Sequence, residues 1–331
     1  MTSRTIRAGV VGTGRIGQEV VRGIVASGDQ TFVSAVVMDP RKAGRDVADL
    51  VPGAPRGVTA TADLDEALAS DVEVLYYCGL GKPLEVAHYL GRLAEAGKDA
   101  ITLTGLIHPP TAIGQEAAAQ LDAQAVRGGG RILGAGWNPG FLLDVLPVIW
   151  GSSCVRIEHV FAQRVAEMRD WGPGVHTECG IGLPPEEVTD TDSNPLHESV
   201  ALVADGLGIE LDKLENFHEP YVSRSRRAHG ERVVLPGHNA GFHKRALGYN
   251  GGKGIIEIEM YGIFCIDPDE DPVEESAVVR VHGESTVESW ARGDWFGDSY
   301  PVTAARAIRA AGPLGRMPPG LYRPDQIPLS V

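Results

Sequence analysis

The feature that most constrains the fold of this chain is a glycine-rich stretch near its start, Gly12-Thr13-Gly14-Arg15-Ile16-Gly17. An apolar run at Ile6–Val11 predicts a buried strand before it, and apolar residues at helical spacing over Gln18–Ser27 predict a helix after it. G-x-G-x-x-G between a strand and a helix is typical of a dinucleotide-binding βαβ unit. Gly12 would form the tight turn, Gly14 would let the backbone approach a pyrophosphate, and Gly17 would let the helix pack on the strand. We therefore expect all six residues to bind the cofactor.

A second predicted strand, Phe32–Met38, ends at Asp39, 22 residues after the last glycine. An acid at about this distance accepts hydrogen bonds from the adenosine ribose hydroxyls, which favours NAD. Arg41 follows, with Lys42 and Arg45, and a cation there can hold the 2′-phosphate of NADP. The alternative is that these cations lie in an exposed loop. The sequence leaves NAD or NADP open, and it favours NAD or the use of both.

The rest of the first half alternates strand and helix patterns. Strands are predicted at 72–78, 100–104 and 131–134, and helices at 83–96 and 110–126. This alternation indicates an α/β domain with a parallel sheet and right-handed crossovers. The polarity alternates with period two in the second half, at 155–165, 254–264, 277–281 and 286–290. These segments predict an antiparallel sheet with one wet face, with helices at 196–206 and 303–311.

The composition excludes several classes of protein. At about 100–200 residues per domain, 331 residues predict two domains. The net charge of −14 argues against a nucleic-acid or anionic membrane partner, because phosphate contacts need clustered cations. The four cysteines form no C-x-x-C pair, so we expect neither a metal site nor a disulfide framework. No apolar stretch approaches about 18 residues, and a cytoplasmic protein is expected.

Two charged segments of the second half stand out. The loop at 267–272 carries four acids, which we interpret as a solvated hairpin rather than a calcium site, because the EF-hand spacing is missing. The basic run at 224–227 is either a solvated turn or a partner for nearby acids.

The ordered motifs of the chain resemble those of one family, the 2,4-diaminopentanoate dehydrogenases and native amine dehydrogenases, which are relatives of dihydrodipicolinate reductase. The segments that carry the resemblance are GVVGTGRIG (9–17), MDPRKAGRDVADL (38–50), GWNPGFLLDVLP (136–147), GIGLPPEEV (180–188), LPGHNAGFHKRALGYNGG (235–252), GDSYPVTAARAIRAAG (297–312) and PPGLYRPDQIPL (318–329).

The resemblance implies a Rossmann domain at 1–140 and a second α+β domain with an open antiparallel sheet at 141–298, which binds substrate and forms a homodimer. The segment 299–331 would then pack back on the Rossmann domain. The implied reaction is NAD(P)H-dependent reductive amination of a small carbonyl compound with ammonia, or the reverse oxidation of the amine.

One position departs from the family pattern. Family amine dehydrogenases carry a glutamate at the end of the strand that corresponds to 100–104, and this chain has Thr104 or Gly105 there. A threonine cannot act as a general base at neutral pH. A carbonyl or preformed-imine reductase, which needs no ammonia-handling carboxylate, is therefore an alternative. A third reading is a non-catalytic NAD(P)-binding sensor.

The candidate chemistry residues come from three segments. Thr104 could bind the substrate or the nicotinamide carboxamide, or could simply end a strand, and His108 could donate a proton or cap the backbone. Asn138 would line the nicotinamide, unless its turn is purely structural. His176 and Glu178 lie where the family contributes substrate-pocket residues, and either could replace the missing carboxylate.

Overall fold

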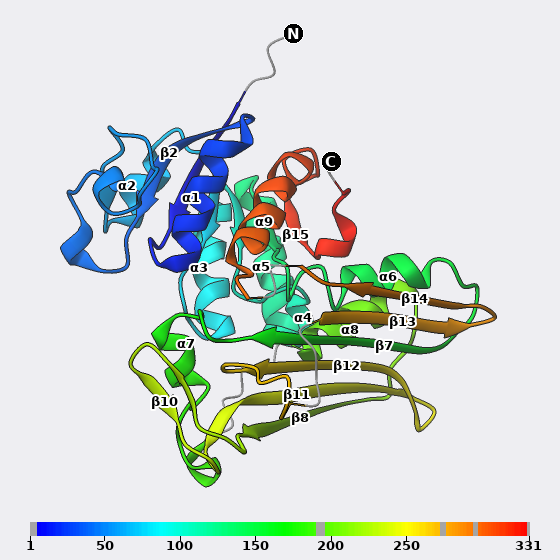
Figure 1. Cartoon of the computed structure of the whole chain (residues 1–331). Helices are drawn as coiled ribbons and strands as arrows, with labels where there is room; N and C mark the ends of the chain where they lie inside the picture. The colour runs from blue at the N-terminus through cyan, green and yellow to red at the C-terminus, as the bar shows by residue number, and fades with distance from the viewer. Residues whose placement is uncertain (1–4, 190–195, 272–275, 294–296, 330–331) are drawn as a thin grey trace. The chain divides into compact units, whose positions relative to one another are not determined.

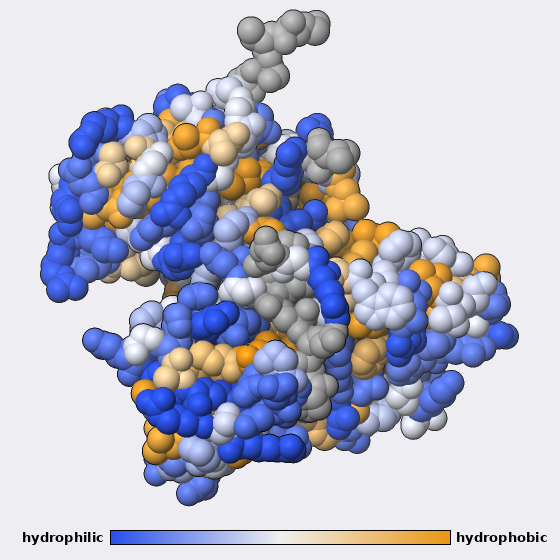
Figure 2. Space-filling model, in the orientation of Figure 1, coloured by the Kyte–Doolittle hydropathy of each residue, from blue (hydrophilic) through white to orange (hydrophobic). Residues whose placement is uncertain are grey.

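The computed structural model describes residues 5–189, 196–271, 276–293 and 297–329. The chain divides into two compact units. The first combines Met1–Phe141 with Tyr300–Val331, and the second comprises Leu142–Ser299. No helix among the described residues is long and apolar enough to span a membrane. Figure 2 shows hydrophilic residues spread over the surface of both units, with hydrophobic residues in smaller areas between them.

The first unit is built on a seven-stranded sheet in the order β15-β6-β5-β4-β1-β2-β3. Every neighbouring pair is parallel, as the sequence predicts. The strands are β1 (Ile6–Val11), β2 (Gln30–Val36), β3 (Ala60–Thr61), β4 (Val74–Tyr77), β5 (Asp99–Thr102), β6 (Arg131–Gly134) and β15 (Gly320–Tyr322). The helices are α1 (Arg15–Ser27), α2 (Leu64–Ala69), α3 (Pro83–Glu95), α4 (Pro109–Ile113), α5 (Gln115–Gly128) and α9 (Tyr300–Leu314).

Helices pack on this sheet and form two separate hydrophobic clusters with its strands. One cluster joins α1 and α9 to the strands, and the other joins α2, α3 and α5 to them. Val20, Val21 and Ile24 of α1 are fully buried, since the i, i+3, i+4 spacing places them on one face of the helix. Helices α1 and α9 lie side by side (Figure 1), where Gly23 faces the Ile308 side chain.

The second unit contains a six-stranded sheet in the order β14-β13-β7-β12-β11-β8. Its strands are β7 (Ile157–Glu167), β8 (Lys213–Val222), β11 (Asn239–Asn250), β12 (Lys253–Ile263), β13 (Ser276–Gly283) and β14 (Thr286–Ala291). The prediction of an antiparallel sheet is correct for four of the five pairs and wrong for β7–β12, which is parallel. The sheet is therefore mixed. A separate hairpin pairs β9 (Arg227–His229) with β10 (Arg232–Val234).

One face of the six-stranded sheet is covered by helices. Helix α8 (Leu196–Leu207) packs against β8, β11 and β12, and α6 (Val145–Gly151) packs against β7 and β13. Along β11, Phe242 and Ala246 are buried on this face, whereas His243 and Arg245 point to the other face and are only partly buried. The short helix α7 (Pro173–Glu178) follows β7 in the chain.

Two local predictions need correction. The single helix expected at 110–126 is two helices, α4 and α5, because Gly114 adopts a φ of 86° between them. The acidic loop is not fully solvated, because Asp271 is buried and paired with Arg227 at 2.6 Å. Their side chains are 2% and 3% exposed, so the basic run supplies a buried partner to the acidic loop. Pro272 lies outside the described residues.

Candidate functional site

The glycine-rich loop connects β1 to α1 and has the shape that a dinucleotide requires. Gly12 adopts a φ of 96°, a conformation that favours glycine. Gly17 packs so closely on the turn that an added Cβ would overlap the carbonyl oxygen of Gly12. Gly14 is different, because an added Cβ there would meet no protein atom within 4 Å. Gly12 and Gly17 are thus required by the packing of the protein itself, whereas the open side of Gly14 is available to a ligand.

The start of α1 supplies hydrogen-bond donors to the same place. The first helical bond runs from the Gln18 N–H to the Gly14 carbonyl, so the N–H groups of the first turn have no partner within the helix. A helix N-terminus of this kind carries positive potential and binds phosphate. The loop therefore fits a dinucleotide pyrophosphate by its shape and by its donors.

The predicted ribose acid, Asp39, follows β2 and is already engaged by Arg41. The Nε and Nη2 atoms of Arg41 lie 2.9 Å from the two Asp39 carboxylate oxygens, and the Arg41 backbone N–H donates to the same carboxylate. These hydrogen bonds lower the pKa of Asp39 to about 2. Lys42 lies 3.4 Å from the Thr13 hydroxyl of the glycine loop. The acid and two cations are therefore held together beside this loop.

The loops after β4 and β5 lie next to each other. Thr104 donates from its hydroxyl to the Gly79 carbonyl at 2.9 Å, and Gly79 lies within 3.4 Å of the position that a Cβ on Gly12 would take. His108 is buried at the start of α4, with Nδ1 2.8 Å from the Thr111 hydroxyl. Thr104 is thus joined to the loops that surround the glycine-rich turn.

Asn138 lies after β6, in a turn with a cis peptide bond to Pro139. Aromatic stacking surrounds this turn, because the Trp137 and Phe141 ring centroids are 5.3 Å apart. The Arg306 guanidinium of α9 lies 4.3 Å from the Phe141 centroid, a cation–π contact. The C-terminal part of the chain therefore braces the turn that carries Asn138.

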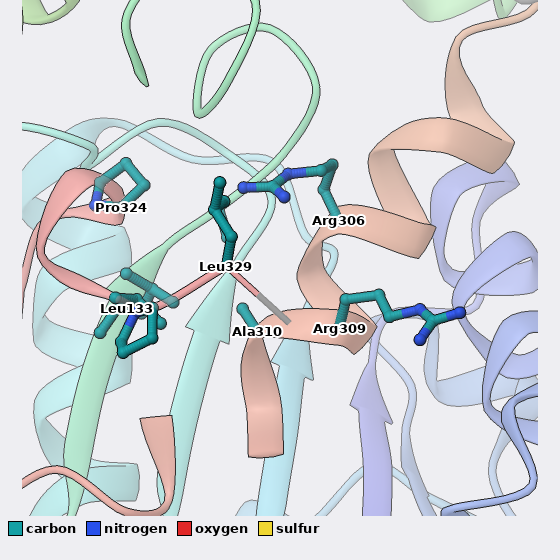
Figure 3. Close-up of a pocket in the computed structure, with 9 residues that line it drawn as sticks. Leu133, Arg306, Arg309, Ala310, Pro324 and Leu329 are labelled. Carbon is teal, nitrogen blue, oxygen red and sulfur yellow. The ribbon is translucent and has the colours of Figure 1, made fainter. Parts of the chain in front are cut away.

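A small cavity lies beside the same arginine. Figure 3 shows Arg306 and Arg309 leaving α9 in different directions, with Arg306 reaching toward Leu329. The cavity, lined also by Leu133 and Pro324, measures about 20 Å³. It could hold one water molecule, and it is far too small for a nicotinamide or a substrate.

These residues share one edge of the first sheet. The loops after β2, β1, β4, β5 and β6 all follow the carboxyl ends of neighbouring parallel strands. The strand order reverses between β1 and β4, which is the topological switch point where ligands bind in open α/β sheets. The structure thus places the predicted cofactor residues, Thr104 and Asn138 at the same edge of the sheet.

The two remaining candidates belong to α7 of the second unit. His176 is buried, its Nε2 lies 2.7 Å from the Met168 carbonyl, and its ring meets Phe264 edge-on. A carbonyl can only accept, so Nε2 carries the hydrogen and is committed to this bond. Glu178 is exposed. A second acid of this unit, Glu167, is buried and accepts hydrogen bonds from the backbone N–H groups of Arg169, Cys265 and Ile266.

Sequence reasoning missed several residues that the fold places near these groups. Arg306 reaches the Asn138 turn from a helix almost 170 positions later, and no local pattern marks it. Gly79 carries a signal in hindsight, since it follows a predicted strand at the sheet edge where ligands bind. Among the described residues, no cluster of three His, Cys, Asp or Glu side chains could hold a metal ion.

Comparison with known proteins places this chain in a family. The chain is 29% identical over 182 residues to 2,4-diaminopentanoate dehydrogenase of Acetoanaerobium sticklandii, a match that covers 53% of this chain and 51% of that protein. It thus spans about half the length of that relative. It is 25% identical to an amine dehydrogenase of Streptomyces virginiae, over 97% of this chain and 95% of that protein.

The fold is shared with solved dehydrogenases. The structure of amine dehydrogenase from Mycobacterium smegmatis matches with a TM-score of 0.85 at 20% identity, over 98% of this chain and 96% of that chain. Other structures with this fold contain NADH, NAD or NADP⁺. These dinucleotide-bound structures share the fold that the sequence predicts for NAD or NADP binding. The model of the 2,4-diaminopentanoate dehydrogenase C-terminal domain matches residues 141–322, more than half of the sequence, so the chain belongs to that family, as its motifs predict.

Proposed function

We propose that the protein is an NAD(P)-dependent oxidoreductase that reduces a small carbonyl or imine by reductive amination, or oxidises the corresponding amine. The observation that carries the proposal is the row of loops at the sheet edge, in which Gly14 leaves open space, Asp39 faces Arg41, and Thr104 and Asn138 follow β5 and β6. The bound nicotinamide would supply or accept the hydride. The relatives named above are amine and diaminopentanoate dehydrogenases, which supports this class of reaction.

The protein groups of this site would bind, orient and exchange protons. Asn138 would orient the nicotinamide from its braced turn. His108 is the proposed proton donor, since an imidazole ring can carry and release a proton and Thr111 holds this ring in place. His176 and Glu178 remain proposals for the substrate side. His176 has only Nδ1 to offer, because Nε2 is bonded to Met168.

Thr104 supports a second candidate, a carbonyl or preformed-imine reductase. Its hydroxyl donates to Gly79, so only its oxygen lone pairs are left to accept a bond from a substrate or cofactor. The hydroxyl cannot take the proton that ammonia loses when it adds to a carbonyl at neutral pH. A reductase of carbonyls or of preformed imines has no such step.

A single assay separates these proposals. The full-length protein is mixed with NADH or NADPH and a panel of small ketones and aldehydes, with and without ammonia, and the absorbance at 340 nm is followed. Cofactor oxidation that requires ammonia supports reductive amination, and oxidation without ammonia supports the carbonyl reductase. Cofactor binding with no turnover on any compound supports the sensor and refutes both enzyme proposals. If the missing carboxylate limits reductive amination, the variant Thr104→Glu should create or raise ammonia-dependent turnover.

We also propose that the protein is a homodimer, assembled through the face of the six-stranded sheet opposite α6 and α8. This face carries aromatic side chains, and Trp290 on it is 66% exposed. It also carries cations and acids in alternation, such as Arg245 beside Glu257 and Arg280 beside Glu288, so two copies can meet with complementary charge. Light scattering after size-exclusion chromatography should give a molar mass twice that of one chain. The variant Trp290→Glu should lower this mass toward that of a single chain.

A further inference from the structure

The first residue of α1 departs from a rule of helix chemistry. It is Arg15, although the N-terminus of a helix carries partial positive charge and favours acids, and the first turn of α1 contains no acid. The Arg15 side chain is 52% exposed, so packing in the core does not explain its position. Departures of this kind are expected at functional sites, where a ligand compensates them.

The Arg15 side chain extends beyond the start of the helix. Side chains in an α-helix lean toward its N-terminus, and no earlier turn of α1 lies beneath Arg15. The helical hydrogen bonds begin only at the Gln18 N–H, so the N–H groups of the first turn lie on the same side as this guanidinium. An anion at this point can accept hydrogen bonds from the backbone and from Arg15 together.

The acid one turn further along the helix does not hold Arg15. Glu19 accepts a hydrogen bond from the Arg22 Nη1 atom at 2.5 Å, whereas the Arg15 Nε atom lies 3.9 Å from Glu19, beyond hydrogen-bond distance. Glu19 is therefore engaged mainly by Arg22, and it does not draw the Arg15 guanidinium back along α1.

An aromatic ring from the last part of the chain meets the Arg15 guanidinium. The central carbon of the guanidinium lies 5.6 Å from the centroid of the Tyr300 ring, and Tyr300 is the first residue of α9. Eight residues later on both helices, Gly23 faces Ile308, so α1 and α9 run in the same direction with their first turns side by side. A cation on a ring face keeps its N–H groups in the guanidinium plane, where they can donate to an anion.

Further along, α9 contacts a second loop of the same sheet edge. The Thr303 methyl group lies 3.4 Å from the position that a Cβ on Gly136 would take, and the Arg306 guanidinium lies over the Phe141 ring. These contacts hold α9 to the turn after β6. Tyr300 therefore reaches Arg15 from a helix that is itself fixed in place, as a positioning residue requires.

We propose that Tyr300 is a positioning residue of the cofactor site, whose ring holds the Arg15 guanidinium over the start of α1 so that Arg15 donates to the pyrophosphate. The inference rests on the proposed binding of NAD(P) to the glycine loop. The ring does not itself bind the cofactor, and its effect passes entirely through Arg15. The segment that follows the second unit thus contributes to dinucleotide binding as well as to the sheet.

The test is a double-mutant cycle on cofactor binding, measured by fluorescence titration of the full-length protein with NADH. Arg15→Gln should raise the dissociation constant about tenfold, because it removes a charge-assisted hydrogen bond. Tyr300→Leu should raise it roughly 2- to 5-fold, and Tyr300→Phe, which keeps the ring, should bind like the wild type. The double variant should bind no more weakly than Arg15→Gln alone, because the ring has no effect without the arginine.

Two further measurements separate positioning from a general structural role. ADP-ribose contains the pyrophosphate but no nicotinamide, so Tyr300→Leu should weaken the binding of ADP-ribose and of NADH by the same factor. Arg22→Gln is the matched control, since it removes the same charge from α1 but lies two turns beyond Arg15 and pairs with Glu19. This control should bind NADH like the wild type. Thermal melting without cofactor shows whether each variant is folded.

The possible failures can be told apart. A wild type that binds neither NADH nor ADP-ribose would refute the proposed cofactor site, and this inference with it. If the wild type binds both, the inference alone is overturned by wild-type affinity in Tyr300→Leu, by losses that multiply in the double variant, or by an equal loss in Tyr300→Phe or Arg22→Gln. A loss for NADH but not for ADP-ribose would also overturn it. If Tyr300→Leu does not fold, Tyr300→Met replaces the ring by a flexible apolar chain and makes the same comparison.

Discussion

The role of the glycine loop in protein packing can be distinguished from its role in ligand binding by adding a single methyl group to one glycine at a time. In Gly14→Ala the new methyl enters open space, and the φ of −74° is accessible to alanine. Alanine is a poorer N-cap than glycine by roughly 0.5 kcal/mol, and it restricts the unfolded chain by a similar amount. We therefore expect the free energy of unfolding to change by less than about 0.5 kcal/mol, which moves the melting temperature by no more than ~2 °C.

The same methyl would occupy the side of the loop from which a pyrophosphate approaches. Inserting a methyl into a fitted contact costs about 1–3 kcal/mol. The dissociation constants for NADH and NADPH should therefore rise by roughly 5- to 150-fold. Gly17→Ala is the counterpart, because its methyl would overlap the Gly12 carbonyl, a backbone atom that cannot move aside cheaply. This variant should lose more than about 1 kcal/mol of stability even without cofactor.

The assay is fluorescence titration of both variants with NADH and NADPH, beside thermal melting without cofactor. We expect Gly14→Ala to melt like the wild type and to bind both cofactors poorly, and Gly17→Ala to melt at a lower temperature. Wild-type affinity in Gly14→Ala would refute the assignment of this loop to the pyrophosphate. An early melt in Gly14→Ala would show that the open space beside it is in fact occupied by protein.

Three further predictions follow from named contacts. Arg41→Ala should raise the pKa of Asp39 from about 2 toward 3.8 in a carbon-13 NMR titration. The same variant should raise the KM for NADPH more than the KM for NADH, and an equal change in the two KM values would exclude Arg41 from 2′-phosphate binding. Burial alone would raise the pKa of Asp271, but bonds from Arg227, the Asp267 N–H and the Tyr221 hydroxyl outweigh it, so the pKa lies below 3.8. In urea unfolding, Asp271→Asn should lose about 3–5 kcal/mol at pH 7, and the wild type should lose this contribution only as the pH falls below about 3.8; a loss under 1 kcal/mol would contradict the role of the pair. Arg306→Ala should lower stability by roughly 0.5–2 kcal/mol and change the near-ultraviolet circular dichroism of the stacked rings, while Arg306→Lys keeps part of both; an unchanged spectrum in Arg306→Ala would argue against the brace.

Local patterns in the sequence predict the first unit well because its elements follow one another in space. The strand–glycine–helix order at 6–27 defines one βαβ crossover, and each later strand adds to an edge of the same sheet. The division of charge is also clearer in the structure. Residues 142–299 carry a net charge of −15, so the remaining residues carry +1 of the total of −14.

The sequence could not reveal features that depend on distant partners. Alternating polarity identifies β7 and β12 as half-buried strands, but the alternation is the same for parallel and antiparallel neighbours, so the parallel pair was not predictable. The burial of Asp271 depends on an arginine 44 positions away. Thr104 is only partly of this kind. Its hydrogen bond to Gly79 could not be predicted, but the absence of a carboxylate at this position was visible in the sequence and already raised the question of whether ammonia is used.

The position of β15 has a consequence for the synthesis of this chain on the ribosome. This strand pairs with β6, and α9 packs on α1, yet 158 residues of the second unit separate Phe141 from Tyr300. Until the last part of the chain emerges, β6 remains an unpaired edge strand, and the Gln30 side chain lacks the Ile308 carbonyl to which it donates. Exposed edges of this kind promote aggregation. The first unit is thus the first to begin folding and the last to be completed, and a chain truncated before residue 300 should depend on chaperones to remain in solution.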